Sequence, residues 1–108
     1  MARAPNTDAK GRPFARYLVD RVWLKAEPVS GFYMFRRDAC GTEIAKQEFG
    51  KTTPLGWEVD HIRPIALGGT DDLDNLQPLH WKNNRRKADT WPDWRPATCT
   101  GNTSGQTP

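Results

Sequence analysis

A polar loop at residues 66–74 divides the second half of the chain into short segments. The loop, ALGGTDDLD, holds two glycines and three aspartates, a composition typical of turns and loops. Before it, residues 56–62 alternate in a way that predicts a strand ended by Pro64. After it, NLQPL predicts a second short strand, and residues 80–88 contain helix formers without Gly or Pro. The order strand, loop, strand, helix therefore constrains the fold more than any other feature.

Two further elements are expected upstream. Residues 14–26 carry apolar side chains at the i, i+3, i+4 spacing of an amphipathic helix, and Pro28 and Gly31 fit its end. An aromatic run that meets a polar turn at residues 38–41 predicts a short hairpin. Together these elements predict a small α+β domain over residues 14–95, with an N-terminal helix and a short hairpin.

The two ends of the chain differ from the middle. Residues 1–13 carry two prolines, a glycine and no large apolar residue except Met1, and residues 96–108 are small and polar. We expect a disordered arm and a disordered tail there. Only 36% of the 108 residues are hydrophobic, so the core must be thin, and the five tryptophans supply much of its bulk. The stretch WPDW at residues 91–94 is expected to pack its aromatic rings as a cap. No apolar run approaches the ~20 residues of a membrane span, so we expect a soluble, cytoplasmic protein with no membrane contact.

The two cysteines, Cys40 and Cys99, are too far apart for a C-x-x-C pair. A disulfide between them is possible. Because the sequence shows no secretion signal, two free thiols are the favoured interpretation.

Four polar residues follow the predicted strand, loop and helix in an order that suits metal-assisted hydrolysis of a phosphodiester. His61 is the candidate general base, because neutral imidazole accepts a proton near pH 7. Asp60 and Asn84 offer the carboxylate and amide oxygens that Mg²⁺ or Mn²⁺ prefers, enough for one ion rather than two. Asn75, where the loop rejoins a strand, is expected to bind loop backbone and orient the His61 segment.

One geometric difficulty attends this set. Consecutive side chains on a regular strand point to opposite faces, and Asp60 and His61 are adjacent. We therefore expect the strand to break or twist at this point, with Pro64 favouring an irregular exit.

Charge placement favours an anionic partner. The net charge is only +3, but four basic residues lie on the predicted last helix, namely Lys82, Arg85, Arg86 and Lys87. Beside a phosphate-cleaving site they are expected to contact a nucleic-acid backbone. The aspartates of the loop, Asp71, Asp72 and Asp74, lack the spacing of a calcium loop and are expected to be solvated.

The run EVDHIRPIALGGTDDLDNLQPLHWKNNRRKAD, with its pattern D-H-I-x-P, G-G, N-L-Q-x-L and N-x-x-K, resembles the HNH endonuclease family. The resemblance covers roughly residues 56–89 and implies a ββα-metal (His-Me) finger that cleaves DNA and leaves a 5′-phosphate. It implies that His61 is the general base, that Asp60 and Asn84 bind the divalent metal, and that Asn75 supports the loop.

The sequence departs from many relatives at two places. His80 and Asn83 stand where those relatives carry a later cysteine pair, so a structural zinc is not expected, and His80 is interpreted as structural rather than as a further metal ligand. Trp57, Trp81 and the N-terminal helix are expected to stabilise the fold instead. The last motif position is Asn84 rather than histidine, which favours Mg²⁺ or Mn²⁺ over zinc.

Two alternatives to a DNA endonuclease remain open. One is a non-catalytic module that binds nucleic acid through the same finger and basic helix. The other is an RNA nuclease. Because a single site cuts one strand, double-strand cleavage would need a homodimer, a partner subunit or two separate events.

Overall fold

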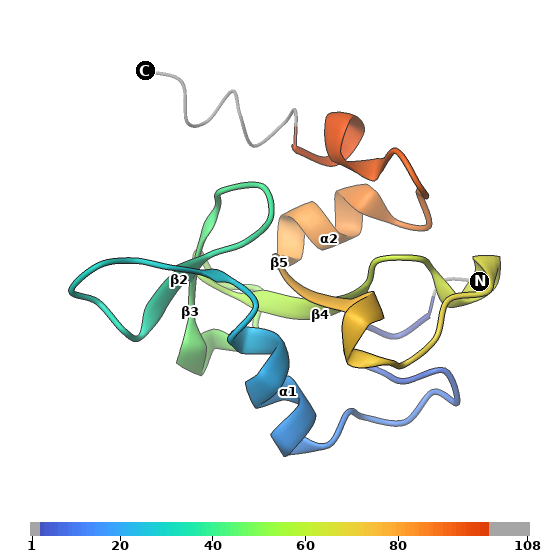
Figure 1. Ribbon diagram of the computed structural model, residues 1–108, viewed down its shortest axis with the longest axis horizontal. Coiled ribbons are helices and arrows are strands. Elements are labelled where there is room, and N and C mark those ends of the chain that lie inside the picture. Colours follow the sequence, from blue (N-terminus) through green and yellow to red (C-terminus); the bar gives the residue numbers. More distant parts are fainter. Residues whose placement is uncertain (1–2, 100–108) are drawn as a thin grey trace.

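The computed structural model describes residues 3–99 and contains short helices and strands in a mixed α+β arrangement (Figure 1). Helix α1 (Arg16–Trp23) precedes a three-stranded antiparallel sheet of β1 (Glu27–Pro28), β2 (Phe35–Arg37) and β3 (Glu43–Ala45). Strands β4 (Trp57–His61) and β5 (Leu76–His80) form an antiparallel pair, and α2 (Trp81–Lys87) follows β5 directly. Short 3-10 turns occupy Lys46–Glu48, Ile65–Leu67 and Leu73–Asn75. The expected helix, hairpin and strand-loop-strand-helix order are confirmed.

The β4–β5 pair lies between the two helices (Figure 1) and presents a different face to each. Side chains alternate along β4, and the apolar alternate positions join α1 in the core. This core contains Val19, Val22, Trp23, Ala26, Ile44, Trp57, Val59 and Leu76. Trp57 is its largest fully buried side chain, and its indole Nε1 donates to the Ala45 carbonyl at 2.9 Å. The opposite face of β4 carries Glu58 and Asp60, both buried beneath α2.

Not every aromatic residue packs as expected. Tyr17, which the helical pattern places on the apolar stripe of α1, is 66% exposed. Trp94 is buried, as expected of the cap, whereas Trp91 is 41% exposed. The aromatic cap is therefore confirmed for Trp94 and wrong for Trp91.

The expectation of a disordered arm does not hold for residues 3–13, which pack against the sheet. Asn6 Oδ1 accepts a hydrogen bond from the backbone N–H of Val59 at 2.8 Å, on the edge of β4 that β5 does not pair with. A β-bridge between Thr7 and Pro13 closes the arm on itself. The composition of the arm is typical of a flexible segment. These contacts nevertheless hold it in place, because they give hydrogen-bond partners to backbone groups that lose contact with water.

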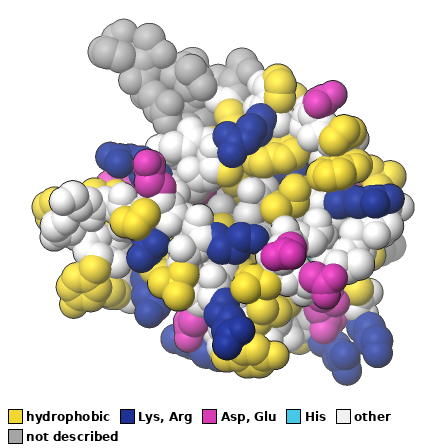
Figure 2. Space-filling model, viewed as in Figure 1, with side chains coloured by type: hydrophobic (Ala, Val, Ile, Leu, Met, Phe, Trp, Pro, Cys, Tyr) yellow, Lys and Arg dark blue, Asp and Glu magenta, His cyan; other side chains and the backbone are white. Residues whose placement is uncertain are grey.

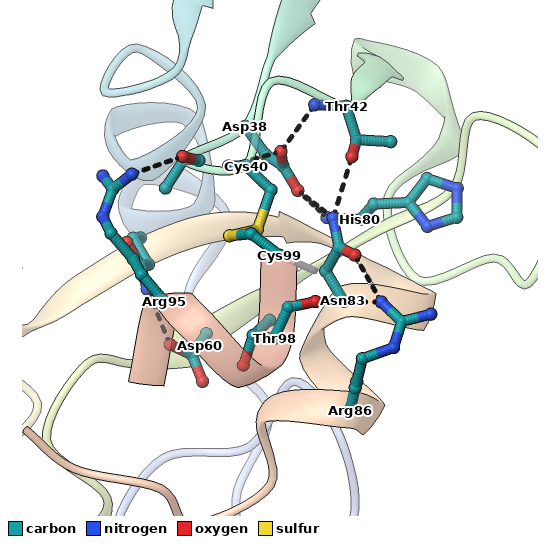
Figure 3. Close-up of a disulfide and its surroundings, with 12 residues drawn as sticks. Asp38, Cys40, Thr42, Asp60, His80, Asn83, Arg86, Arg95, Thr98 and Cys99 are labelled. Atoms are coloured by element: carbon teal, nitrogen blue, oxygen red, sulfur yellow. Dashed lines mark hydrogen bonds between the residues drawn. A yellow bond between two sulfur atoms is a disulfide. The ribbon is translucent and has the colours of Figure 1, made fainter. Parts of the chain in front are cut away.

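The other end of the chain also differs from expectation. Residues 94–99 are helical, so the described part of the expected tail, residues 96–99, is ordered. Cys40 and Cys99 form a disulfide across a sequence separation of 59 residues (Figure 3), so the expectation of two free thiols is wrong. The missing secretion signal was the only ground for expecting free thiols. The fold places the two cysteines together by packing the last helix against the hairpin turn. The rest of the expected tail, residues 100–108, lies outside the described residues.

We expect the disulfide to contribute about 2–4 kcal/mol to the free energy of unfolding, because it closes a long loop in the unfolded chain. Urea denaturation of the oxidised protein, the reduced protein and the Cys40→Ser, Cys99→Ser double variant measures this contribution. The reduced protein and the double variant should lose the same amount of stability. If native protein without reductant reacts with an alkylating reagent at both cysteines, the bond does not form.

Candidate active site

A cleft of about 300 Å³ opens beside residues 58–61 of β4. Its walls come from β4, the turn after it, α2 and residues 3–7 of the arm. The cleft is lined by three of the four motif residues, Asp60, His61 and Asn84, together with Glu58 and Arg85. The structure therefore brings the proposed base and the proposed metal ligands to one cavity.

The carboxylate of Asp60 is buried and paired. Its Oδ1 lies 3.3 Å from Lys87 Nζ, and its Oδ2 accepts a hydrogen bond from Gln77 Nε2 at 3.0 Å. Burial raises the pKa of Asp60 above its ordinary value, and the Lys87 charge and the Gln77 hydrogen bond oppose that rise. The same ammonium donates to the backbone oxygen of His61 at 3.1 Å.

Lys87 is therefore not a surface residue. Its side chain is 0% exposed, and its Nζ lies 5.7 Å from the centre of the Trp94 ring. The nucleic-acid contact expected of Lys87 does not fit the structure, because a fully buried ammonium cannot reach a phosphate outside the protein. The sequence placed Lys87 among exposed nucleic-acid contacts, and its burial beside Trp94 becomes evident only in the folded chain.

Glu58 is a site residue that the sequence reasoning missed. It is buried, and its Oε1 accepts from Asn84 Nδ2 at 2.8 Å while its Oε2 pairs with Arg85 Nη2 at 2.7 Å. The signal was present in the strand alternation, which places Glu58 on the same face as Asp60. These two contacts hold α2 over β4. Because Asn84 Nδ2 donates to Glu58, the orientation of the Asn84 amide group is defined.

His61 lies on the other face of β4. Its ring packs 5.7 Å from that of Phe14, and its Nε2 lies 2.9 Å from Asp71 Oδ1. The strand stays regular here, since His61 still pairs with Leu76 in the ladder. The expected break or twist at Asp60 and His61 is therefore wrong, and the two side chains diverge as a regular strand requires.

Asn75 makes the backbone hydrogen bonds expected of it. Its Oδ1 accepts from Arg63 N at 2.8 Å, and its Nδ2 donates to the carbonyls of Arg63 at 3.0 Å and Thr70 at 2.8 Å. These three bonds hold the loop that follows β4. Gly69 belongs to the same arrangement, because a Cβ on it would lie 1.7 Å from the Arg63 carbonyl oxygen.

The donor set of the cleft suits a hard cation. Asn84 Nδ2 is engaged by Glu58, which leaves the amide oxygen, with no hydrogen bond from the described residues, as the free ligand atom. Residues 3–99 contain no group of three or more His, Cys, Asp and Glu side chains placed to hold a metal ion. Asp60 and Asn84 would supply two oxygen ligands, and Mg²⁺ commonly keeps waters and substrate phosphates for the rest. The residues present therefore fit such an ion, provided that Lys87 yields its contact with Asp60.

The remaining basic residues of α2 differ in their exposure and in their hydrogen-bond partners. Lys82 and Arg85 are exposed and lie 5.6 Å and 5.8 Å from the Trp81 ring centre. Arg86 donates to Asn83 Oδ1 and to the Thr98 carbonyl, so it ties α2 to the C-terminal helix. On the face drawn in Figure 2, lysines and arginines are scattered among hydrophobic side chains rather than gathered in one patch.

The comparison with known proteins identifies a family for part of the chain. Residues 39–90 match the family model of the HNH endonucleases. The resemblance drawn from the sequence is confirmed, and the matched HNH segment contains β3, β4, β5, α2 and all four motif residues. The match indicates a nuclease-type function, since the family generally comprises endonucleases that act on nucleic acid with a divalent metal. No curated protein and no solved structure matches the chain.

A hydrogen-bonded cluster centred on Asp38, just before the HNH segment, includes His80 and Asn83, the residues that the resemblance places where a later cysteine pair was expected (Figure 3). Asp38 Oδ2 accepts from His80 N at 2.8 Å and Asn83 Nδ2 at 3.0 Å, and its Oδ1 accepts from Cys40 N and Thr42 N. Buried polar groups are stable only when paired in this way. The cluster and the adjacent disulfide therefore join the hairpin turn, α2 and the C-terminal helix.

Both ring nitrogens of His80 are also engaged. Nε2 faces the Pro54 carbonyl at 2.9 Å, and Nδ1 accepts from Lys82 N at 3.1 Å as the N-cap of α2. These bonds support the structural interpretation of His80 rather than the alternative of a further metal ligand.

Replacing Lys87 with Met should lower the free energy of unfolding by about 3–5 kcal/mol, because it leaves the buried Asp60 carboxylate without its cation. Lys82→Met is the matched control on the same helix and should change stability by no more than about 0.5 kcal/mol. Urea denaturation followed by circular dichroism measures both. Equal stability of the two variants would contradict a structural role for the Lys87 ion pair.

Proposed function

We propose that this protein is a metal-dependent DNA endonuclease that hydrolyses phosphodiester bonds with His61 as general base. The observation that supports the proposal most is that His61, Asp60 and Asn84 line one cleft inside the HNH segment. An imidazole and two oxygen donors are the groups that this reaction requires. Arg85 lines the same cleft and adds a positive charge near an incoming phosphate.

Each residue has a separate task in this proposal. The His61 ring accepts the proton of the attacking water. Asp60 and Asn84 hold one divalent ion, Mg²⁺ or Mn²⁺, which when bound stabilises negative charge on the phosphate and on the departing 3′ oxygen. Asn75 keeps the loop after β4 in place through its three backbone hydrogen bonds. The family resemblance implies a product with a 5′-phosphate.

Nucleic-acid contact is assigned to the exposed basic residues of α2. Lys82 can reach backbone phosphates, while Arg85 and Arg86 contribute charge from side chains that are already hydrogen-bonded, Arg85 to Glu58 and Arg86 to Asn83 and Thr98. Phosphate contacts carry little sequence information, so low sequence specificity is part of the proposal. Double-strand cleavage would require a homodimer, a partner subunit or two separate events, because the described chain carries a single proposed site.

Two structural features bear on the cellular location of the protein. No helix among the described residues is long and apolar enough to cross a membrane. The cytoplasmic location expected from the sequence remains a prediction, and the Cys40–Cys99 disulfide favours an oxidising compartment instead.

Purified protein should convert supercoiled plasmid to the open-circular form in Mg²⁺ or Mn²⁺ and should not do so in EDTA. Agarose gels measure the conversion, and an RNA substrate runs in parallel. Metal-independent binding without cleavage under every condition would support the non-catalytic module. Cleavage of RNA alone would support the RNA nuclease.

His61→Ala should lower the nicking rate by about 100-fold or more, because general base catalysis is lost, and should leave plasmid binding nearly unchanged. Gel shifts and single-turnover nicking measure the two effects. His80→Gln tests the only other histidine and should lower thermal stability with little effect on the nicking rate of the folded protein. If His61→Ala nicks plasmid at the wild-type rate, the base assignment is wrong.

A further inference from the structure

We propose that Asp71 is a positioning residue for His61: it holds ring nitrogen Nε2 and leaves Nδ1 as the atom that takes the proton from water. This inference rests on the proposed function for its catalytic consequence. It goes beyond the motif, since Asp71 belongs to the loop aspartates for which we expected only solvent exposure.

The contact itself defines the tautomer. Asp71 Oδ1 lies 2.9 Å from His61 Nε2, and a carboxylate can only accept a hydrogen bond. Neutral His61 must therefore carry its hydrogen on Nε2. The described residues give Nδ1 no hydrogen-bond partner, so its lone pair is free to accept a proton. Which nitrogen of a histidine is basic depends in this way on what its other nitrogen binds.

Asp71 is itself held from a distant part of the chain. Both of its carboxylate oxygens lie 3.1 Å from the backbone N–H of Ala9, a residue 62 positions earlier. Asp8 shapes the turn that presents this N–H, because its Oδ1 accepts from Lys10 N and Arg12 N, each at 2.9 Å. The backbone hydrogen bond from Arg12 is the main cause that lowers the pKa of Asp8.

Among the described residues, Asp71 is the charged side chain that contacts the His61 ring directly, while the neighbouring Asp60 interacts with His61 electrostatically without a hydrogen bond. The Phe14 ring packs against the imidazole at 5.7 Å, and the His61 side chain is only 11% exposed. Lys87 contacts the backbone oxygen of His61, not its ring, and Asp60 is engaged on the opposite face by Lys87 and Gln77. The ring is therefore confined by an aromatic contact and oriented by a single carboxylate.

The chain contains an internal reference for the test. It has only two histidines, and His80 Nδ1 accepts from the Lys82 backbone N–H while its Nε2 faces the Pro54 carbonyl. His80 therefore also carries its hydrogen on Nε2, for reasons that do not involve Asp71. In a spectrum that reports ring tautomers, the His61 signals should respond to replacement of Asp71 and the His80 signals should not.

The experiment compares wild type with Asp71→Ala, Asp71→Asn and the control Asp72→Asn. Asp72 is exposed, lies in the same loop and accepts from Thr70, so its replacement removes the same charge without touching His61. Ring ¹⁵N spectra of histidine-labelled, metal-free protein are recorded at about pH 8, above the ordinary pKa of imidazole. Single-turnover and steady-state nicking then separate kcat from KM, and circular dichroism verifies folding.

We expect wild-type His61 to show the Nε2–H tautomer and Asp71→Ala to show a mixture, with His80 unchanged. The kcat should fall about 10-fold or more in Asp71→Ala, since a misplaced tautomer disables a base, while KM stays within about 3-fold. Asp71→Asn, whose amide oxygen can still accept from Nε2, should recover part of kcat. Asp72→Asn should match wild type in both measurements.

Three results would overturn the inference. These are the same His61 tautomer in wild type and Asp71→Ala, a wild-type ring protonated on both nitrogens at about pH 8, and an unchanged kcat in Asp71→Ala. If wild type shows no nicking but the tautomer responds to Asp71 as expected, the pairing stands and the proposed endonuclease function fails. The spectra and the kinetics thus judge the two proposals separately.

Discussion

The ammonium group of Lys87 joins α2, β4 and the C-terminal helix through polar and aromatic contacts. It extends from α2 to the Asp60 carboxylate at 3.3 Å and to the His61 carbonyl at 3.1 Å, and it lies over the Trp94 ring of the C-terminal helix. A buried charge without a partner costs several kcal/mol, so neither Asp60 nor Lys87 could occupy this region alone. The acidic face of β4 can therefore be covered by α2 only because that helix supplies cations, with Arg85 paired to Glu58 in the same way.

The small apolar core explains why both ends of the chain are used for packing. Among residues 3–99, the core cluster contains eight buried residues, which is a small core for a domain of this size. The described ends add polar contacts rather than apolar area. Asn6 pairs with the free edge of β4, and the disulfide joins Cys99 to the hairpin turn beside the Asp38 cluster. Cross-links and satisfied polar clusters are a common means of stabilising a small domain.

The elements could be predicted from the sequence where the signal is local. Alternation predicted β4, turn composition predicted the loop after it, and the role of Asn75 followed from the ability of its amide to replace backbone partners. Glu58 could have been found by the same alternation that placed Asp60.

The remaining features depend on contacts between residues far apart in the sequence. Ala9 meets Asp71 across 62 residues and Cys40 meets Cys99 across 59, and neither pairing leaves a periodic pattern. Lys87 resembles a surface cation in the sequence because its burial depends on Trp94 and the C-terminal helix, which follow it in the chain. A local pattern can specify a helix, but it cannot specify which of its faces another segment will cover.

The adjacency of Asp60 and His61 separates the two chemical tasks of the site. A regular strand directs the carboxylate toward α2 and the imidazole toward Phe14 and Asp71, so the proposed metal ligands and the proposed base have different neighbours. The cleft beside residues 58–61 of β4 is lined by residues of both faces. The carboxylate of Asp60 can therefore be held by a cation on one side while the histidine ring is held by a carboxylate on the other. If the two side chains shared one face, the same neighbouring charges would act on both groups. A substitution that altered the surroundings of one group would then alter those of the other.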